Sequence, residues 1–450
     1  MFFLPAVALA DADAVPSVSF TRDIAPVLTQ KCLTCHGPEK NKGGYRLHTF
    51  EALSKPGESK AAPVTPGKPA RSKIFQLITT RDADDRMPQK DDPLPAAQIT
   101  LIERWIKEGA RFDGPDPQAA LASYVPAAPH PDPPAAYPRP VAVLALAFTP
   151  DGKELAAGGY HEVTFWNPAD GSLVRRVKNV AERTQSLAFS PDGRLLAVAG
   201  GAPGKSGEVK LFDAVTGLPV KTLLASADLV LALAFSPDGT RLAAGGADNA
   251  IRIFNTGSGQ FELLIEQHAD WVTALAFRAD GAQLASASRD KSARLFNTRT
   301  GELESAYLGH GEAIFTIAYA PDSAQVFSAG RDRKIHRWDL KEAKKTEEID
   351  GFAGEVLQLI VANGQLFSAS ADGQVRQHAL TGKKAELICT FAGHQDFVYA
   401  LAFHAETKRL ASGSYDGEVR VWNADDGKML ARFPAAPGLV GGAGRASAQR

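Results

Sequence analysis

Residues 231–246 read LALAFSPDGTRLAAGG, two alternating apolar runs on either side of a Pro-Asp-Gly turn. Alternation with a period of two favours half-buried strands, and the turn between them favours a β-hairpin. The hairpin occurs in seven copies, which begin at residues 144, 186, 231, 274, 316, 357 and 400. A period of about 40 residues is typical of four-stranded blades. We therefore expect an all-β, seven-bladed propeller over residues 141–434, followed by a flexible tail at 435–450.

The segment after each hairpin is expected to add a third and a fourth strand. The third strand ends near an aromatic or apolar residue in most copies, at Trp166, Phe212, Phe254, Phe296, Trp338 and Trp422. The fourth strand of the last copy is expected at Lys428–Phe433. The last blade would then be completed by a fourth strand from its own repeat.

The last copy, GHQDFVYALAF at 393–403 and LASGSYDGEVRVWN at 410–423, resembles the WD-repeat family. In that family four side chains form a hydrogen-bonded tetrad inside one blade. The resemblance implies two such tetrads with identical spacing, namely His310, Ser328, Asp332 and Trp338, and His394, Ser412, Asp416 and Trp422. A third set, His268, Ser286 and Asp290, has Phe296 in place of the tryptophan. The first two copies lack the tetrad, and the sixth has His378 where tryptophan is expected.

Residues 32–36 read CLTCH, and C-x-x-C-H is the attachment pattern for a c-type haem. Two thiols at this spacing can form thioethers with the haem vinyl groups, which places the adjacent imidazole at the iron as its proximal ligand. A zinc site needs about four ligands, and a redox-active Cys pair does not need the histidine. We therefore expect one covalent haem on Cys32 and Cys35, with His36 on the iron. Cys389 reads as a small buried apolar residue.

Three helices are expected around this motif, at residues 17–36, Ser72–Thr79 and Pro95–Glu108, and Asp23 is expected to cap the first. Helix, C-x-x-C-H, loops, helix, Met-Pro and helix is the order of a small class I cytochrome c. The chain resembles the planctomycete-type cytochrome c module over about residues 17–115, which implies an all-α domain. The resemblance rests on the stretches FTRDIAPVLTQKCLTCHG, GGYRLHTFEAL, PGKPARSKIFQLI, DDRMP and ERWIKEGA.

The resemblance implies Met87 as the distal iron ligand, opposite His36. The residues themselves agree, because a thioether is a soft, neutral ligand that suits haem iron. Met87 also lies in a polar stretch where a core-filling methionine is not expected, and the other two methionines lie outside the domain. His48, inside the same module, is the alternative distal ligand.

Residues 1–14 resemble the end of a secretory signal peptide, with an apolar run followed by small-x-small sites, although the basic segment is missing. Residues 116–140 carry proline at nearly every third position and should form an extended, semi-stiff linker. No other stretch approaches the roughly 18 apolar residues that a transmembrane helix needs. Together with covalent haem attachment, these features predict a bacterial protein that is periplasmic or otherwise exported.

The net charge of −1 gives no reason to expect nucleic-acid binding. We expect a non-catalytic electron-transfer protein with a redox partner protein and with a second protein partner on the propeller. The WD-repeat resemblance implies that the segment entering each inner strand faces solvent, which places Trp271, Phe397, Arg289, Arg331 and Tyr415 on an exposed rim unless Trp271 and Phe397 pack between blades. The alternative is a redox enzyme whose propeller binds a second cofactor or a carbohydrate-type substrate and passes electrons to the haem.

Overall fold

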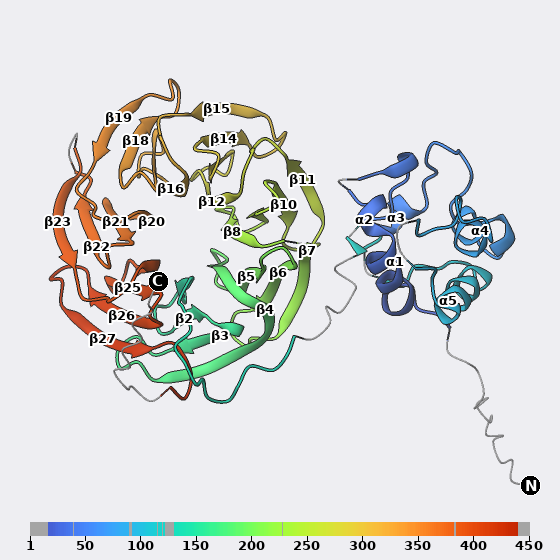
Figure 1. Ribbon diagram of the computed structural model, residues 1–450, viewed down its shortest axis with the longest axis horizontal. Helices are drawn as coiled ribbons and strands as arrows, with labels where there is room; N and C mark the ends of the chain where they lie inside the picture. The colour runs from blue at the N-terminus through green and yellow to red at the C-terminus, as the bar shows by residue number, and fades with distance from the viewer. Residues whose placement is uncertain are drawn as a thin grey trace, which may run out of the picture. The chain divides into compact units, whose positions relative to one another are not determined.

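The computed structural model describes residues 17–38, 40–89, 92–114, 116–118, 120–121, 130–226, 228–381 and 384–439. The chain divides into two compact units, residues 1–126 and residues 127–450, which Figure 1 draws as a helical body and a ring of sheets. The signal-peptide-like segment 1–14 lies outside the described residues. So do residues 122–129 of the expected linker and residues 440–450 of the expected tail.

The first unit is built from short helices in the part that the structure describes. Two of the three predicted helices lie where the apolar spacing placed them, α4 and α5. None of the described helices is long and apolar enough to span a bilayer. The elements in chain order are η1 (Phe20–Ile24), α1 (Ala25–Lys31), α2 (Leu33–His36), η2 (Lys42–Gly44), α3 (Phe50–Leu53), η3 (Pro69–Arg71), α4 (Lys73–Thr79) and α5 (Ala96–Lys107).

The predicted helix at 17–36 is divided into the π-helical turn η1 and the helices α1 and α2, with a break at Cys32. Its N-cap is Ser19, whose hydroxyl accepts the backbone N–H of Arg22 at 3.0 Å. Asp23 instead accepts the backbone N–H of Ser19 at 2.9 Å. The prediction that Asp23 is the cap is therefore wrong, because the hydroxyl of Ser19 already satisfies a free N–H of the first turn.

An apolar core holds η1, α1 and α5 together. Phe20 is fully buried, and its ring centroid lies 5.4 Å from that of Trp105 on α5 and 4.8 Å from that of Phe50. The indole N–H of Trp105 donates to the carbonyl of Arg111 at 3.0 Å. This packing anchors the helix that ends at the C-x-x-C-H segment.

The second unit consists of antiparallel strands in sequence order. One sheet has seven strands, β1 to β7, and five sheets have four strands each, β8–β11, β12–β15, β16–β19, β20–β23 and β24–β27. The strands are β1 (Leu146–Phe148), β2 (Leu155–Gly158), β3 (Tyr160–Trp166), β4 (Leu173–Phe189), β5 (Leu195–Ala202), β6 (Ser206–Asp213), β7 (Pro219–Ser226), β8 (Val230–Phe235), β9 (Arg241–Gly246), β10 (Ile251–Asn255), β11 (Phe261–Ile265), β12 (Val272–Phe277), β13 (Gln283–Ser288), β14 (Ala293–Asn297), β15 (Leu303–Tyr307), β16 (Ile314–Tyr319), β17 (Gln325–Gly330), β18 (Ile335–Asp339), β19 (Lys345–Ile349), β20 (Val356–Ala362), β21 (Gln365–Ser370), β22 (Val375–Ala379), β23 (Glu386–Phe391), β24 (Val398–His404), β25 (Arg409–Ser414), β26 (Glu418–Asn423) and β27 (Met429–Pro434).

The sheets follow one another around a ring, and the first sheet meets the last (Figure 1). The backbone N–H of Val143, just before β1, donates to the carbonyl of Ser414 at the end of β25 at 3.1 Å. Leu146 and Phe148 of β1 share one apolar cluster with residues of β24 to β27. The last sheet takes its fourth strand, β27, from its own repeat, close to the predicted Lys428–Phe433.

The first two repeats form one continuous sheet, where separate sheets were expected. The 17-residue strand β4 is the outer strand of the first repeat and continues as the inner strand of the second. Its middle contains no glycine or proline, so nothing in the sequence ends the strand. Asn179, with φ of 63°, bends it and lets both pairings persist.

The third-strand anchors at Trp166, Phe212, Phe254, Phe296, Trp338 and Trp422 are all buried, between 0% and 5% exposed. They fill the apolar clusters within and between neighbouring sheets. Burial of side chains of this size supplies roughly 1.5–3 kcal/mol each, which makes them main contributors to ring stability.

Residues 130–140, part of the expected linker, have no helix or strand but are bound to the ring; we call them the strap. The hydroxyl of Tyr137 donates to the buried carboxylate of Glu162 on β3 at 2.7 Å. The backbone N–H of Tyr137 donates to the carbonyl of Pro437 at 2.9 Å. The strap therefore belongs to the ring unit rather than to a free tether.

Candidate functional site

His36 lies at the end of α2, where the C-x-x-C-H spacing placed it. Its Nδ1 is 3.2 Å from the carbonyl oxygen of Tyr45. A proton on Nδ1 donates to this carbonyl, which fixes the ring and leaves Nε2 as the nitrogen available to a metal. The backbone N–H of Leu47 donates to the carbonyl of His36 at 2.8 Å, so the segment after η2 is held against the motif.

A cavity of about 360 Å³ opens beside this histidine. Cys32, His36 and Met87 all contribute to its wall, which is otherwise mainly apolar. Met87 is held there by its backbone N–H, which donates to the carbonyl of Leu77 at 3.0 Å. The apolar wall residues from three segments of the chain are Leu47, Pro63, Ile74, Leu77 and Ile78.

His48, the alternative ligand, is not among the described residues of this cavity wall. Its Nδ1 is buried without a hydrogen-bond partner in the described part of the chain. Burial, together with the charge of Arg46, lowers the pKa of His48 and favours the neutral ring. Of the two candidate distal ligands, the structure brings only Met87 to the cavity.

The donor set fits a c-type haem. A thiol, an imidazole with its second nitrogen already engaged and a thioether meet around an apolar space, which suits a planar, largely apolar macrocycle. Burial raises the pKa of the Cys32 thiol to about 12. Cys32 and Cys35 are both partly exposed, and the backbone N–H of Cys35 donates to the carbonyl of Cys32 at 3.2 Å.

Two further residues shape the site without having been singled out in the sequence. Tyr45 orients His36 through a backbone carbonyl, which carries no side-chain signal. Gly57 packs so closely that a Cβ there would meet the carbonyl oxygen of Gly43 at 2.6 Å and the Cβ of Tyr45 at 3.0 Å. The glycine is therefore needed for the loop to close one side of the cavity.

In the ring, the tetrad of the sheet β16–β19 forms as the family resemblance implied. His310 Nδ1 is 2.6 Å from Asp332 Oδ2, and its Nε2 is 2.8 Å from Ser328 Oγ. The indole N–H of Trp338 donates to the same hydroxyl at 3.1 Å. Every polar atom of the tetrad is satisfied when Trp338 donates to Ser328, Ser328 to His310, and His310 to Asp332.

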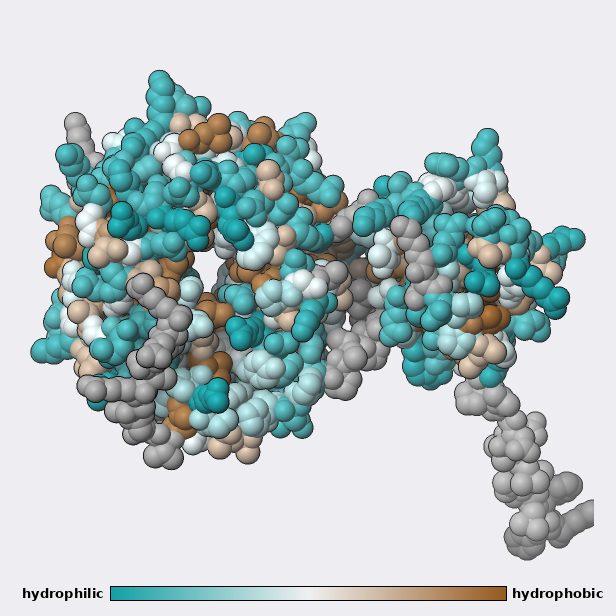
Figure 2. Space-filling model, viewed as in Figure 1, coloured by the Kyte–Doolittle hydropathy of each residue, from teal (hydrophilic) through white to brown (hydrophobic). Residues whose placement is uncertain are grey.

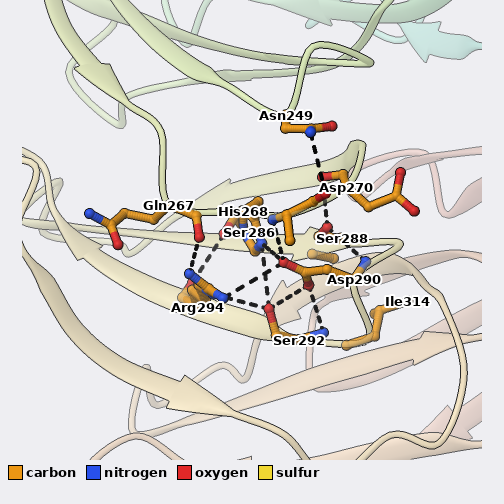
Figure 3. Close-up of polar contacts among 12 residues, drawn as sticks. Asn249, Gln267, His268, Asp270, Ser286, Ser288, Asp290, Ser292, Arg294 and Ile314 are labelled. Atoms are coloured by element: carbon orange, nitrogen blue, oxygen red, sulfur yellow. Dashed lines mark hydrogen bonds and ion pairs between the residues drawn. The ribbon is translucent and has the colours of Figure 1, made fainter.

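The sheet β12–β15 has an equivalent network despite Phe296 (Figure 3). His268 Nδ1 lies 2.8 Å from Asp290 Oδ2, and His268 Nε2 lies 2.7 Å from Ser286 Oγ. Ser292 adds a bond to Asp290 at 2.5 Å that the sequence reasoning did not include, and Arg294 reaches Ser292 and the carbonyl of Gln267. A serine and an arginine thus reinforce the network that lacks the tryptophan.

The last tetrad is incomplete. Ser412 contacts His394 at 2.8 Å and accepts the indole N–H of Trp422 at 3.0 Å. No hydrogen bond joins His394 to Asp416 among the described residues, and His394 Nδ1 is buried without a partner. Burial, with the nearby charge of Arg420, lowers the pKa of His394 to about 4. The four-residue tetrad expected here is therefore wrong in its Asp416 member.

The side chains expected on the rim differ in their contacts and in their exposure. The Arg289 guanidinium lies over the Trp271 ring, 4.3 Å from its centroid. Phe397 and Tyr415 are 45% and 54% exposed, and the backbone N–H of Tyr415 donates to the carbonyl of Phe397 at 2.9 Å.

The ring of Tyr399 lies between these two aromatic rings in the chain of contacts. Its centroid is 6.2 Å from that of Phe397 and 6.0 Å from that of Tyr415. We call Phe397, Tyr399 and Tyr415 the aromatic patch. Because Phe397 is 45% exposed, it is a surface residue and does not pack between blades.

Arg331 lies outside this patch in its contacts and forms an ion pair with Glu355 at 2.9 Å.

Ligating atoms of His310, Asp332 and His336 lie within 4.8 Å of one another. Both nitrogens of His310 are already engaged in its tetrad, and His336 Nδ1 lies 2.9 Å from the hydroxyl of Tyr307. Burial lowers the pKa of His336 to about 4. His310 is thus committed to its tetrad, whereas His336 Nε2 is buried without a hydrogen-bond partner among the described residues and lies 3.4 Å from a carboxylate oxygen of Glu348.

Two known protein families match this chain, one in the unit that contains the C-x-x-C-H segment and one in the ring of sheets. Residues 32–91 match the family described as Planctomycete cytochrome C. Five segments match the family described as WD domain, G-beta repeat, at residues 181–213, 217–255, 259–297, 301–339 and 385–423. The chain joins a planctomycete-type cytochrome c domain to WD repeats.

The following curated proteins are each similar to a short part of this chain. A 90-residue stretch is 31% identical to the target of rapamycin complex subunit wat1 of Schizosaccharomyces pombe, covering 20% of this chain and 29% of that protein. WD repeat-containing protein 44 of Xenopus laevis is 43% identical over 65 residues, 14% of this chain and 7% of that protein. The anaphase-promoting complex subunit cdc20 of Dictyostelium discoideum is 30% identical over 89 residues, which cover 20% of this chain and 18% of that protein. The chain thus spans less than a third of each of these relatives.

Proposed function

We propose that this protein is an exported, periplasmic c-type cytochrome with one covalent haem, and that it transfers electrons while its WD repeats bind a protein partner. The observation that carries the proposal is the convergence of Cys32, His36 and Met87 on one apolar cavity. Cys32 would give a haem an attachment point, and His36 and Met87 would both hold its iron. Iron held by two protein side chains would have no open position for substrate.

Each residue of the site has a definite task in this proposal. Cys32 and Cys35 hold the haem, which supplies one-electron redox chemistry when bound. The Tyr45 carbonyl orients His36 and raises the basicity of its Nε2 by accepting the Nδ1 proton. Met87 would add a neutral ligand to the iron, and the apolar wall would exclude water. Both features would favour the reduced iron, which carries less charge.

We further infer that the ring is a seven-bladed WD propeller. The support is that β4 contributes to two four-stranded units, so that β1–β7 counts as two blades beside the five four-stranded sheets of the described residues. Propellers of this class commonly present a rigid rim to other proteins, although the fold alone does not establish a function. The exposed aromatic patch on this rim is the natural anchor for a partner.

Mass spectrometry of the intact protein tests the haem assignment. After expression with a haem-attachment system, the mass should increase by one haem, and the increase should survive acid-organic extraction. Cys32→Ala/Cys35→Ala should abolish the increase, and Cys389→Ser should retain it. An unmodified wild-type mass, or a haem retained by the double variant, would refute the assignment.

A further inference from the structure

A second cavity, of about 430 Å³, lies between the strap and the rim of the ring. The strap forms one side through its segment 134–140. The opposite side comes from the β2–β3 turn, from the middle of β4 and from the β25–β26 turn, where Tyr160, Arg183 and Tyr415 lie. The strap bounds this cavity and is bound to β3 through Tyr137 and to β4 through the carbonyl of Pro134.

The strap is held in place by polar contacts at its start and in its middle. At its start, the backbone N–H of His130 donates to the side chain of Asn179 at 3.0 Å, and its ring lies 2.9 Å from Glu208. Further along, the Arg176 guanidinium donates to the carbonyl of Pro134 at 2.7 Å. These contacts make the cavity wall a built part of the ring.

The charge in this cavity is entirely positive and uncompensated. Arg139 of the strap and Arg183 of β4 both line it, both are exposed, and neither side chain has a hydrogen bond or an ion pair in the described part of the chain. None of the described lining residues is acidic. The nearby Glu162 is fully buried and is already bound by Arg176 and Tyr137. Two free guanidinium groups across one cavity suit carboxylates, which they can bind in a bidentate manner.

The cavity also continues into the aromatic patch, because Tyr415 belongs to both. Tyr160 and three prolines of the strap add flat apolar surface. A single inorganic anion would contact the arginines and leave these surfaces empty, whereas an extended peptide can use both. We propose that this cavity binds an acidic segment of a partner protein, with carboxylates on Arg139 and Arg183 and an apolar side chain against Tyr160 and Tyr415.

This inference deepens the proposed docking role and rests on it. It is tested without a redox readout, so that a failure here is distinct from a failure of the haem assignment. The probe is a fluorescein-labelled decapeptide of Glu, Asp and Tyr, measured by fluorescence anisotropy on the full-length haem protein. The comparison peptide has lysine in place of every acidic residue, and inorganic phosphate serves as competitor.

The acidic peptide should bind, its affinity should fall as salt is raised, and neither the lysine peptide nor phosphate at the peptide's concentration should compete. Arg139→Gln and Arg183→Gln should each weaken binding by about tenfold or more, as expected for a lost charge-assisted bond. The control Arg194→Gln changes an exposed arginine in the Asp192–Gly193 turn outside the cavity and should leave binding unchanged. Undiminished binding by the double variant, equal binding of the lysine peptide, displacement by phosphate at the peptide's concentration, or no binding to the wild type would overturn the proposal.

Discussion

Two serines at the same position of neighbouring repeats should respond oppositely to the same substitution. Ser328 on β17 and Ser368 on β21 are both completely buried and occupy equivalent places in their sheets. The hydroxyl of Ser328 has two partners, His310 Nε2 and the indole N–H of Trp338. The hydroxyl of Ser368 has none among the described residues. Alanine at each site therefore removes the same atom from opposite hydrogen-bonding situations.

The magnitudes follow from the partners left behind. Ser328→Ala leaves His310 and Trp338 each with an unsatisfied buried group, at about 1–3 kcal/mol apiece, so the free energy of unfolding should fall by roughly 2–6 kcal/mol. Ser368→Ala removes a hydroxyl that is buried without compensation. It should leave the free energy of unfolding unchanged or raise it by about 1 kcal/mol.

Equilibrium urea unfolding of the full-length protein, followed by far-ultraviolet circular dichroism, measures both changes. The slopes should match the wild type, so that differences in midpoint report stability. If Ser368→Ala destabilises the protein as much as Ser328→Ala, hydrogen bonding in the tetrad is not what distinguishes the two sites, and the reasoning fails.

Three further predictions concern acid stability and the rim. Because burial lowers the pKa of His336 and His378 to about 4, the folded ring binds fewer protons than the unfolded chain between about pH 6.5 and pH 4, and its unfolding free energy should fall as pH falls through that window. A flat profile would contradict this, and His378→Phe should remove part of the fall. Phe397→Ala should change the free energy of unfolding by less than about 0.5 kcal/mol, because the side chain is 45% exposed. Trp271→Ala/Phe397→Ala should abolish capture of a protein partner in affinity purification while the melting temperature stays unchanged, and retained capture would exclude these side chains as anchors.

Much of the fold was predictable because its signals are local. Alternation, Pro-Asp-Gly turns and a constant period encode the hairpins, and helical spacing encodes α4 and α5. Periodicity did not predict the continuity of β4. It marks where each repeat begins, but it does not show whether a breaking residue separates the last strand of one repeat from the first strand of the next. The Asp23 cap was wrong because Ser19, four residues earlier, competes for the same free N–H groups.

The site was predictable only where side chains carry the chemistry. The thiols, His36 and Met87 have recognisable residue types at meaningful spacings, and the structure brings Cys32, His36 and Met87 to one cavity. The Tyr45 carbonyl is a backbone group, and no residue type announces it. The strap cavity joins Arg139, Arg183 and Tyr415, which lie far apart in the sequence, and their proximity depends on how the strap binds and how the ring closes.

The far-red absorption spectrum of the ferric protein tests the central claim most directly. Coordination of iron by a thioether produces a weak charge-transfer band in this region, which follows the Met87 ligand rather than the presence of haem. We expect the band in the wild type and in His48→Ala, and we expect Met87→Ala to lack it while still carrying covalent haem. A band that persists in Met87→Ala, or that disappears in His48→Ala alone, would contradict the assignment of Met87 as the distal iron ligand.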